Sequence, residues 1–181
     1  MSDSQSAFWV FGYGSLLWDP GFTPAEQMRG LLHGYRRSFC MRSLHHRGTK
    51  DHPGLVLALD ETKGAMCHGL AFRVPDQETE QVHQYLRDRE LISAAYVERW
   101  LPVRLEDGRE ISALSYIIEP THVQYCGGLD LEEQAHIISA ATGGRGPNSE
   151  YLYRTVEKLQ VLGVRDADLE WLAKRVKDIN A

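Results

Sequence analysis

The sequence predicts an α+β fold, a small and mostly antiparallel sheet or barrel packed against helices. Three observations lead to this class. Strand-like segments fill the first two thirds of the chain, helix-capping signals gather in the last third, and one helix-like segment lies between strands. The 181 residues contain neither a repeat nor a linker, so we expect a single domain over residues 1–181, with residues 1–7 as a flexible tail.

Six short segments rich in β-branched or aromatic residues are separated by Gly, Pro or Asp, which is typical of strands. They cover residues 8–13, 35–44, 54–60, 67–74, 97–105 and 110–118. The dipeptide Asp107-Gly108 lies between the last two segments. Because Asp-Gly is the strongest short signal for a β-hairpin, these two strands are expected to pair in antiparallel fashion.

Four helices are expected. Residues 77–91 show helical periodicity between two strands, and the other three helices have capping residues at their starts. Asp130 and Glu133 form a capping box before the second helix, Asn148 can cap the third, and Asp166 can cap the fourth. The C-terminal third should therefore be helical.

The charge, the cysteines and the hydropathy of the chain argue against several kinds of binding partner and cellular location. A net charge of −5 argues against a surface that neutralises many phosphates, so we expect no nucleic acid partner. Cys40, Cys67 and Cys126 are odd in number and lack C-x-x-C spacing, which suits a reducing cytoplasm better than a disulfide framework. The polar start and the lack of a long apolar stretch predict a cytoplasmic protein that does not associate with a membrane.

The stretch "FGYGSLLW" from Phe11 is the first candidate binding element. It lacks the third glycine of a dinucleotide fingerprint, the G-K-[ST] of a P-loop and the flanked Ser of a nucleophile elbow. What remains is a strand end that turns through Gly12 and Gly14, where a missing Cβ allows unusual φ angles and close approach of a ligand. Its N–H groups could hold a carboxylate or an oxyanion, or the stretch could be a plain tight turn.

A second glycine-rich loop, "TGGRGPNSEYL", precedes the third helix. It could place Arg145, amides at the start of the helix and Tyr151 near a ligand carboxylate. The alternative is an ordinary loop between helices. The histidines of "SLHHRGTKDH" lack the spacing of a metal site, and we expect no metal there.

A carboxylate interrupts the apolar face of the helix at 77–91. Val82, Leu86 and Glu90 follow one another at intervals of four residues, so Glu90 should point inward, while Arg87 and Asp88 should be ordinary solvated charges. An inward Glu in a partly dry cleft would have a raised pKa, which suits a general base near neutral pH. The alternative is a buried salt bridge from Glu90 to Arg89, Arg36 or Arg37. The spacing does not decide between them.

Five blocks of sequence, in order, resemble the ChaC-type glutathione-specific γ-glutamylcyclotransferases. The blocks are "WVFGYGSLLW", "YRRSF", "HRGT", "YLRDRE" and "GRGPNSEYL", and together they extend over nearly the whole chain. The resemblance implies a γ-glutamylcyclotransferase-like fold, a small mixed β-barrel with surrounding helices, and cleavage of glutathione to 5-oxo-L-proline and L-cysteinylglycine. It also implies a reaction without metal or organic cofactor. We further expect a monomer.

The resemblance assigns roles to individual positions. It places the catalytic glutamate at Glu90 and a substrate contact at Tyr151. It places the substrate-binding loop at Val10, Phe11, Gly12, Tyr13, Gly14, Ser15 and Leu16. The segment "LISAAY" after Glu90 departs from the glycines that are frequent there in the family, which affects the expected width of substrate choice.

Two other functions remain open at this point. The first is a broader cyclotransferase that acts on γ-glutamyl amino acids or γ-glutamylamines, because the same site would serve any leaving amine. The second is a binding module that holds γ-glutamyl compounds without chemistry. Analysis of the products separates the three.

Overall fold

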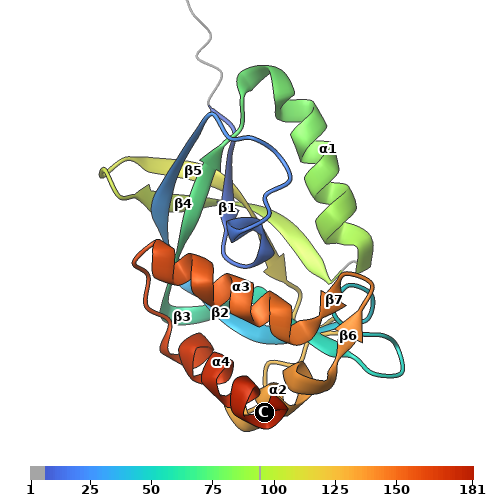
Figure 1. Cartoon of the computed structure of the whole chain (residues 1–181). Helices are drawn as coiled ribbons and strands as arrows, with labels where there is room; N and C mark the ends of the chain where they lie inside the picture. The colour runs from blue at the N-terminus through green and yellow to red at the C-terminus, as the bar shows by residue number, and fades with distance from the viewer. Residues whose placement is uncertain (1–6, 94) are drawn as a thin grey trace, which may run out of the picture.

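The computed structural model describes residues 7–93 and 95–181, and five strands in it form a closed barrel (Figure 1). Its strands are β1 (Trp9–Gly12), β2 (Glu26–Ser43), β3 (Gly54–Arg73), β4 (Tyr96–Leu105) and β5 (Glu110–Ile118). They follow one another in the order β1-β3-β2-β4-β5, and a parallel pairing of β1 with β5 closes the barrel. The α+β class with a small mixed barrel is confirmed. Residues 1–6 of the expected tail lie outside the described residues, and the single domain stays a prediction.

Two strands, β2 and β3, are longer than the sequence suggested. β2 begins at Glu26, nine residues before the expected start at residue 35. The predicted strands at 54–60 and 67–74 are one strand, β3, which pairs with β2 over nearly its whole length. Most of the residues between them, 61–66, are exposed and polar or small, so they lack the apolar alternation that marks a half-buried strand. Backbone pairing with β2 extends the strand where the side chains give no signal.

The hairpin that joins β4 to β5 is confirmed. Arg104 pairs with Glu110 at its base, and the N–H of Gly108 donates to the carbonyl of Leu105 at 2.9 Å. Gly108 has a φ of +93°, the left-handed conformation that glycine adopts without steric cost. The turn dipeptide therefore specified both the pairing and its position.

Four helices surround the barrel: α1 (Thr79–Glu90), α2 (Leu131–Ala140), α3 (Asn148–Val161) and α4 (Ala167–Asn180). Asp130 and Asp166 accept hydrogen bonds from the N–H groups of Glu133 and Leu169, so both predicted caps are confirmed. The predicted cap at Asn148 is wrong. Its buried amide instead bonds to both the N–H and the carbonyl of Leu55, which ties the start of α3 to β3. None of the described helices combines the length and apolarity required to cross a bilayer.

The helices cover different parts of the barrel. In Figure 1, α1 runs along one side of the strands, while α2, α3 and α4 gather below them. Val82 and Leu86 of α1 pack on Val10 and Leu114 of the adjacent strands β1 and β5. Two very short strands, β6 (Thr142–Gly143) and β7 (Gly146–Pro147), pair with each other just before α3. The packing of α1 brings its last residue, Glu90, to the end of β1.

Candidate active site

The segment after β1 divides the predicted substrate loop into two parts. Val10 and Phe11 are fully buried side chains of the strand, and Gly12 is the last residue of β1. A single turn of 3-10 helix at Ser15–Leu17 follows. The four residues after the strand line a small cavity: Tyr13, Gly14, Ser15 and Leu16. The structure therefore brings the second half of the predicted loop to a cavity and leaves the first half in the core.

The glycines of this turn do not adopt the unusual φ angles that we expected. Neither Gly12 nor Gly14 has a positive φ, and the φ of Gly14 is −130°. The restriction at Gly14 is steric, because a Cβ atom there would lie 2.9 Å from the hydroxyl oxygen of Tyr151. Glycine at this position lets the main chain approach that hydroxyl closely.

Glu90 ends α1 and lies at the boundary of two cavities. The larger has a volume of about 410 Å³, within the roughly 300–1,000 Å³ typical of small-molecule sites. The smaller, about 20 Å³, has room for about one water molecule. Both are lined by Ser15, Glu90, Tyr96 and Tyr151. The inward orientation that periodicity predicted for Glu90 is confirmed.

Glu90 both faces the cavity, as a general base would, and forms an ion pair with an arginine. Its side chain is 14% exposed and lines the cavities, while the Nε atom of Arg89 lies 3.5 Å from its Oε1. Burial raises the pKa of Glu90 above its usual value, and the positive charges of Arg89 and Arg145 oppose that rise without cancelling it. Glu90 therefore exchanges its proton at a higher pH than an ordinary glutamate, which is the direction that suits a general base.

Arg89 connects the end of α1 to the turn after β1. Its Nη2 donates to the Oγ of Ser15 at 2.9 Å, and its Nη1 donates to the carbonyl of Asp19 at 2.6 Å and to the hydroxyl of Tyr85 at 3.1 Å. The sequence suggests Arg89 only as an ion-pair partner of Glu90. Its burial agrees with the helical repeat, because Arg89 follows Val82 by seven residues and Leu86 by three, but its acceptors in the turn do not follow from that repeat.

Three tyrosine hydroxyls lie close to Glu90 and are held by the barrel backbone. Tyr151 accepts from the N–H of Leu57 at 3.1 Å, and Tyr96 donates to the carbonyl of the same residue at 2.7 Å. Tyr13 donates to the carbonyl of Tyr116 at 2.7 Å. Burial raises the pKa of Tyr13, Tyr96 and Tyr151, so all three stay neutral hydroxyls. The predicted substrate contact Tyr151 is thus in the site.

The larger cavity has a lining of mixed charge with a small excess of arginines. Four arginines and three acidic residues line it: Arg47, Arg89, Arg145, Arg154, Asp19, Glu90 and Glu150. His46 also lines it, and its pKa falls below the usual value through burial and through nearby positive charge, Arg145 first among the charged neighbours. Such a lining suits a ligand that carries more than one carboxylate.

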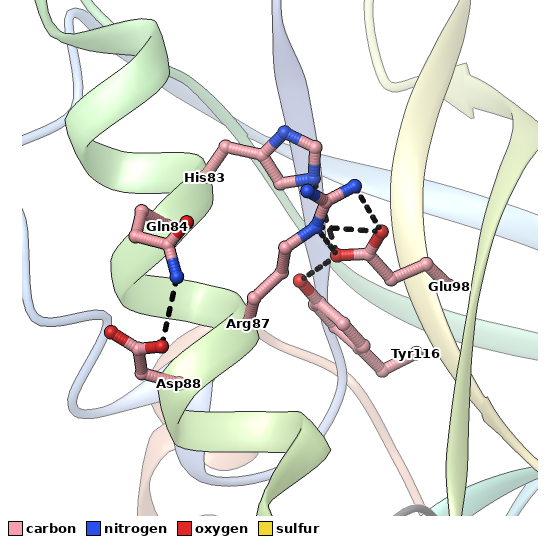
Figure 2. Close-up of polar contacts among 6 residues, drawn as sticks. All are labelled: His83, Gln84, Arg87, Asp88, Glu98 and Tyr116. Atoms are coloured by element: carbon pink, nitrogen blue, oxygen red, sulfur yellow. Dashed lines mark hydrogen bonds and ion pairs between the residues drawn. The ribbon is translucent and has the colours of Figure 1, made fainter.

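A polar network fixes α1 against the barrel (Figure 2). The carboxylate of Glu98 on β4 accepts from Nε and Nη2 of Arg87, at 3.0 Å and 3.1 Å, and from the hydroxyl of Tyr116 at 2.9 Å. His83 is 3.2 Å from the same carboxylate. Burial opposes ionisation of Glu98, but the hydrogen bonds from Arg87 and Tyr116 outweigh it, and its pKa is lowered. The prediction that Arg87 is only a solvated charge is wrong.

Known proteins resemble this chain in sequence and in architecture. The sequence model of the family described as ChaC-like protein matches residues 8–179. The chain belongs to the ChaC family. A relative from Escherichia coli (strain K12), named glutathione-specific gamma-glutamylcyclotransferase, is 38% identical over 177 residues, which cover 98% of this chain and 76% of the relative. A relative of the same name from Schizosaccharomyces pombe is 36% identical, with 91% and 89% of the two chains covered.

A solved structure confirms the fold of this ChaC-family chain. The crystal structure of a yeast gamma-glutamyl cyclotransferase specific to glutathione superposes with a TM-score of 0.86. The match covers 96% of this chain and 97% of the yeast chain at 22% sequence identity. The predicted γ-glutamylcyclotransferase-like barrel with surrounding helices is thereby confirmed.

Proposed function

We propose that this protein is a glutathione-specific γ-glutamylcyclotransferase, a lyase that cleaves glutathione into 5-oxo-L-proline and L-cysteinylglycine. The names of its ChaC relatives support this activity. The observation that carries the chemistry is the position of Glu90, a carboxylate of raised pKa that lines the cavity beside the turn after β1. We assign it the role of general acid–base catalyst.

The reaction supplies its own nucleophile. The α-amine of the γ-glutamyl group attacks the γ-carbonyl carbon, a five-membered ring closes, and the amide bond to cysteine breaks. Because both groups belong to one molecule, correct folding of the substrate lowers the barrier by about 7–11 kcal/mol. The protein must bind that folded conformer and move a proton.

Glu90 is assigned the proton transfer. The α-amine is an ammonium at neutral pH and cannot attack, so the Glu90 carboxylate takes one proton from it. The same carboxyl group then gives this proton to the departing nitrogen of cysteinylglycine. Attack leaves one extra proton on the nitrogen of the new ring, and this second proton also passes through Glu90 to the departing amine, which leaves as an ammonium, so Glu90 returns to its initial charge. Such acid–base catalysis typically contributes about 10²–10⁴-fold to the rate.

The turn and the tyrosines are assigned to the γ-glutamyl group. We propose that main-chain N–H groups between Gly12 and Ser15 hold this group or stabilise the oxyanion of the tetrahedral intermediate. The closeness of Gly14 to the Tyr151 hydroxyl supports a joint contact. The substrate-binding assignment of Val10, Phe11, Gly12, Tyr13, Gly14, Ser15, Leu16 and Tyr151 remains part of this proposal.

The remaining expectations belong to the same proposal. Every chemical step above uses the substrate and side chains of this chain, so the reaction needs neither metal nor organic cofactor. We propose that the protein acts in the cytoplasm as a monomer, and that it binds neither nucleic acid nor a membrane. These points follow from the sequence and are open to direct measurement.

The experiment that tests the function is a comparison of three substrates. Purified protein is incubated with glutathione, γ-glutamyl-alanine and γ-glutamyl-lysine, and 5-oxoproline is measured. Release from glutathione alone, or far faster from it, supports the proposal. Comparable release from γ-glutamyl-alanine would favour the broader cyclotransferase. Tight binding of glutathione with no product would favour the binding module.

A further inference from the structure

Part of the larger cavity is lined by residues that the proposed chemistry does not use. Glu90, Tyr96 and Tyr151 line both this cavity and the small inner one, and we assign the reacting γ-glutamyl group to them. Arg47 and Arg145 line the larger cavity and not the inner one. Because the cysteinylglycine half of glutathione must occupy space outside the reacting end, this part of the lining can select the leaving group.

Arg145 is held in this lining by the main chain. It lies between β6 and β7, and its N–H donates to the carbonyl of His46 at 2.9 Å. The N–H of Gly144 donates to the carbonyl of His45 at 2.7 Å. The two hydrogen bonds fix the backbone at Arg145. The side chain of Arg145 is therefore attached to the cavity wall at a defined position.

The other cavity arginines already have acceptors. Arg47 is buried and donates to the carbonyl of Pro147 at 3.0 Å, and Arg154 pairs with Glu150 at 3.0 Å. Arg89 is bound to the turn and to Glu90. The guanidinium of Arg145, in contrast, is exposed and makes no hydrogen bond or ion pair with any residue in the part of the chain that the structure describes.

The positive charge of Arg145 affects the ionisation of other cavity residues, although its guanidinium is not paired with any of them. It opposes the ionisation of His46 and favours that of Glu90, and both of these residues line the same cavity. An arginine with a fixed backbone, an unpaired fork of donors and a place in the cavity wall is suited to bind a carboxylate of the ligand.

Glutathione offers two carboxylates at different distances from the reacting amine. The first is bonded to the same carbon as that amine, so it must lie beside Glu90, Arg89 and the turn. The second ends the glycine residue, many bonds away in the leaving half. We propose that Arg145 binds this terminal carboxylate, so that the leaving group is recognised by a charge contact and not by size alone. This inference rests on the proposed function.

The test compares glutathione with its glycine monoethyl ester, in which only the second carboxylate loses its charge. The variant is Arg145→Gln. The control is Arg104→Gln, which changes the net charge equally at an exposed position of β4 that does not line the cavity. The readouts are kcat/KM for 5-oxoproline release from both substrates and the melting temperature of each protein.

The wild type should favour glutathione over the ester by about 10- to 100-fold, as expected for one charge-assisted contact. Arg145→Gln should lose about that factor on glutathione relative to the ester, so that its preference between the two substrates disappears, and it should melt like the wild type. Arg145→Lys should recover part of the loss, and Arg104→Gln should change neither substrate.

Several outcomes would overturn the inference while leaving the proposed function intact. The first is a wild type with equal kcat/KM for glutathione and the ester. The second is an Arg145→Gln variant whose kcat/KM for glutathione is unchanged. The third is an Arg145→Gln variant whose kcat/KM falls by the same factor on both substrates. If the wild type releases no 5-oxoproline from glutathione, the proposed function fails and the assignment of Arg145 fails with it. The wild-type arm thus separates the two failures.

Discussion

The Nε atom of Arg89 lies 3.5 Å from Oε1 of Glu90, so two adjacent residues at the end of α1 form an ion pair beside the cavity. Arg89 does not depend on this pair for its hydrogen bonds, because it also donates to Ser15, Asp19 and Tyr85. Glu90 can therefore exchange a proton with a ligand without leaving Arg89 short of acceptors. The ion pair and the proposed catalytic role are compatible.

The first prediction concerns Glu90→Gln. The amide keeps the shape of the carboxylate but cannot accept the ammonium proton, so kcat should fall by about 10²–10⁴-fold while glutathione still binds. Turnover is measured as 5-oxoproline and binding by calorimetry.

The melting temperature of the same variant separates catalysis from structure. Breaking a buried ion pair typically costs about 3–5 kcal/mol, but here Arg89 keeps its other acceptors, so we expect a much smaller loss. A variant that melts far below the wild type and still makes 5-oxoproline at a similar rate would show that Glu90 has only a structural role.

The second prediction is Gly14→Val. Its Cβ atom would be placed 2.9 Å from the Tyr151 hydroxyl, which must move or push the turn aside. We expect a loss of about 1–3 kcal/mol in the free energy of unfolding and a larger fractional loss of kcat/KM.

Gly128→Val is the matched control, because a Cβ atom at Gly128 meets nothing within 4 Å and its φ is not positive. It should retain activity. If Gly14→Val keeps the kcat/KM of the wild type, the close approach of Gly14 to Tyr151 has no part in binding.

The third prediction concerns metal removal. All proposed proton transfers use Glu90 and the substrate amine, so treatment with EDTA followed by buffer exchange should leave the rate of 5-oxoproline release unchanged. A loss of activity in EDTA that zinc restores would contradict the cofactor-free mechanism.

The sequence predicted the parts of the fold that have a local cause. Asp130 and Asp166 cap helices through their own side chains, and Asp107-Gly108 forms a hairpin through its own turn geometry. Asn148 has the same capping chemistry, but Leu55 is far away in sequence and takes its amide. The exposed middle of β3 was missed for a related reason, since its only cause is pairing with β2.

The candidate site shows the same division. The periodicity of α1 predicted that Glu90 points inward, and this followed from the sequence because a helix has a fixed repeat. The same repeat places Arg89 on the inner face, but its acceptors Ser15 and Asp19 come from another part of the chain and do not follow from the repeat. The unpaired state of Arg145 likewise depends on how four arginines share the cavity.

The fourth prediction tests the network of Figure 2 with Glu98→Gln. The neutral amide leaves Arg87 and His83 without a carboxylate, so α1 should be held less firmly and the free energy of unfolding should fall by about 1–3 kcal/mol. We expect kcat to fall with it, because α1 carries Glu90. The matched control is Asp88→Asn, which removes a negative charge from the outer face of α1, where the amide of Gln84 donates to the Asp88 carboxylate at 2.9 Å.

The same network has a defined dependence on pH. Because the pKa of Glu98 is lowered in the folded protein, its contribution is present above the unfolded pKa of about 4.3 and lost as the pH falls through the folded value. Glu98→Gln and the wild type should therefore differ most near neutral pH and converge in acid. An equal difference at all pH values would show that packing, not charge, links α1 to β4.

The last prediction concerns Glu90, whose pKa shift has the opposite sign. Burial raises the folded pKa, so the protonated form is favoured on folding. The corresponding stability is fully present below the unfolded pKa of about 4.3 and is lost as the pH rises through the folded value. Glu90→Gln keeps a neutral side chain at every pH. The difference in melting temperature between Glu90→Gln and the wild type should therefore grow in favour of the variant as the pH rises from about 4.3 through the raised folded pKa of Glu90.

The activity of the wild type should depend on the same ionisation, with the ionised form of Glu90 as the active one. Only the carboxylate accepts the ammonium proton, so kcat/KM should fall as the pH is lowered through the raised pKa of Glu90, above the range of an ordinary glutamate. The inflection in activity and the pH range in which the two melting curves separate should coincide, because both report one group. If the melting curves separate in that range while kcat/KM stays constant across it, Glu90 titrates but does not accept the proton, and the base must be another group of the cavity.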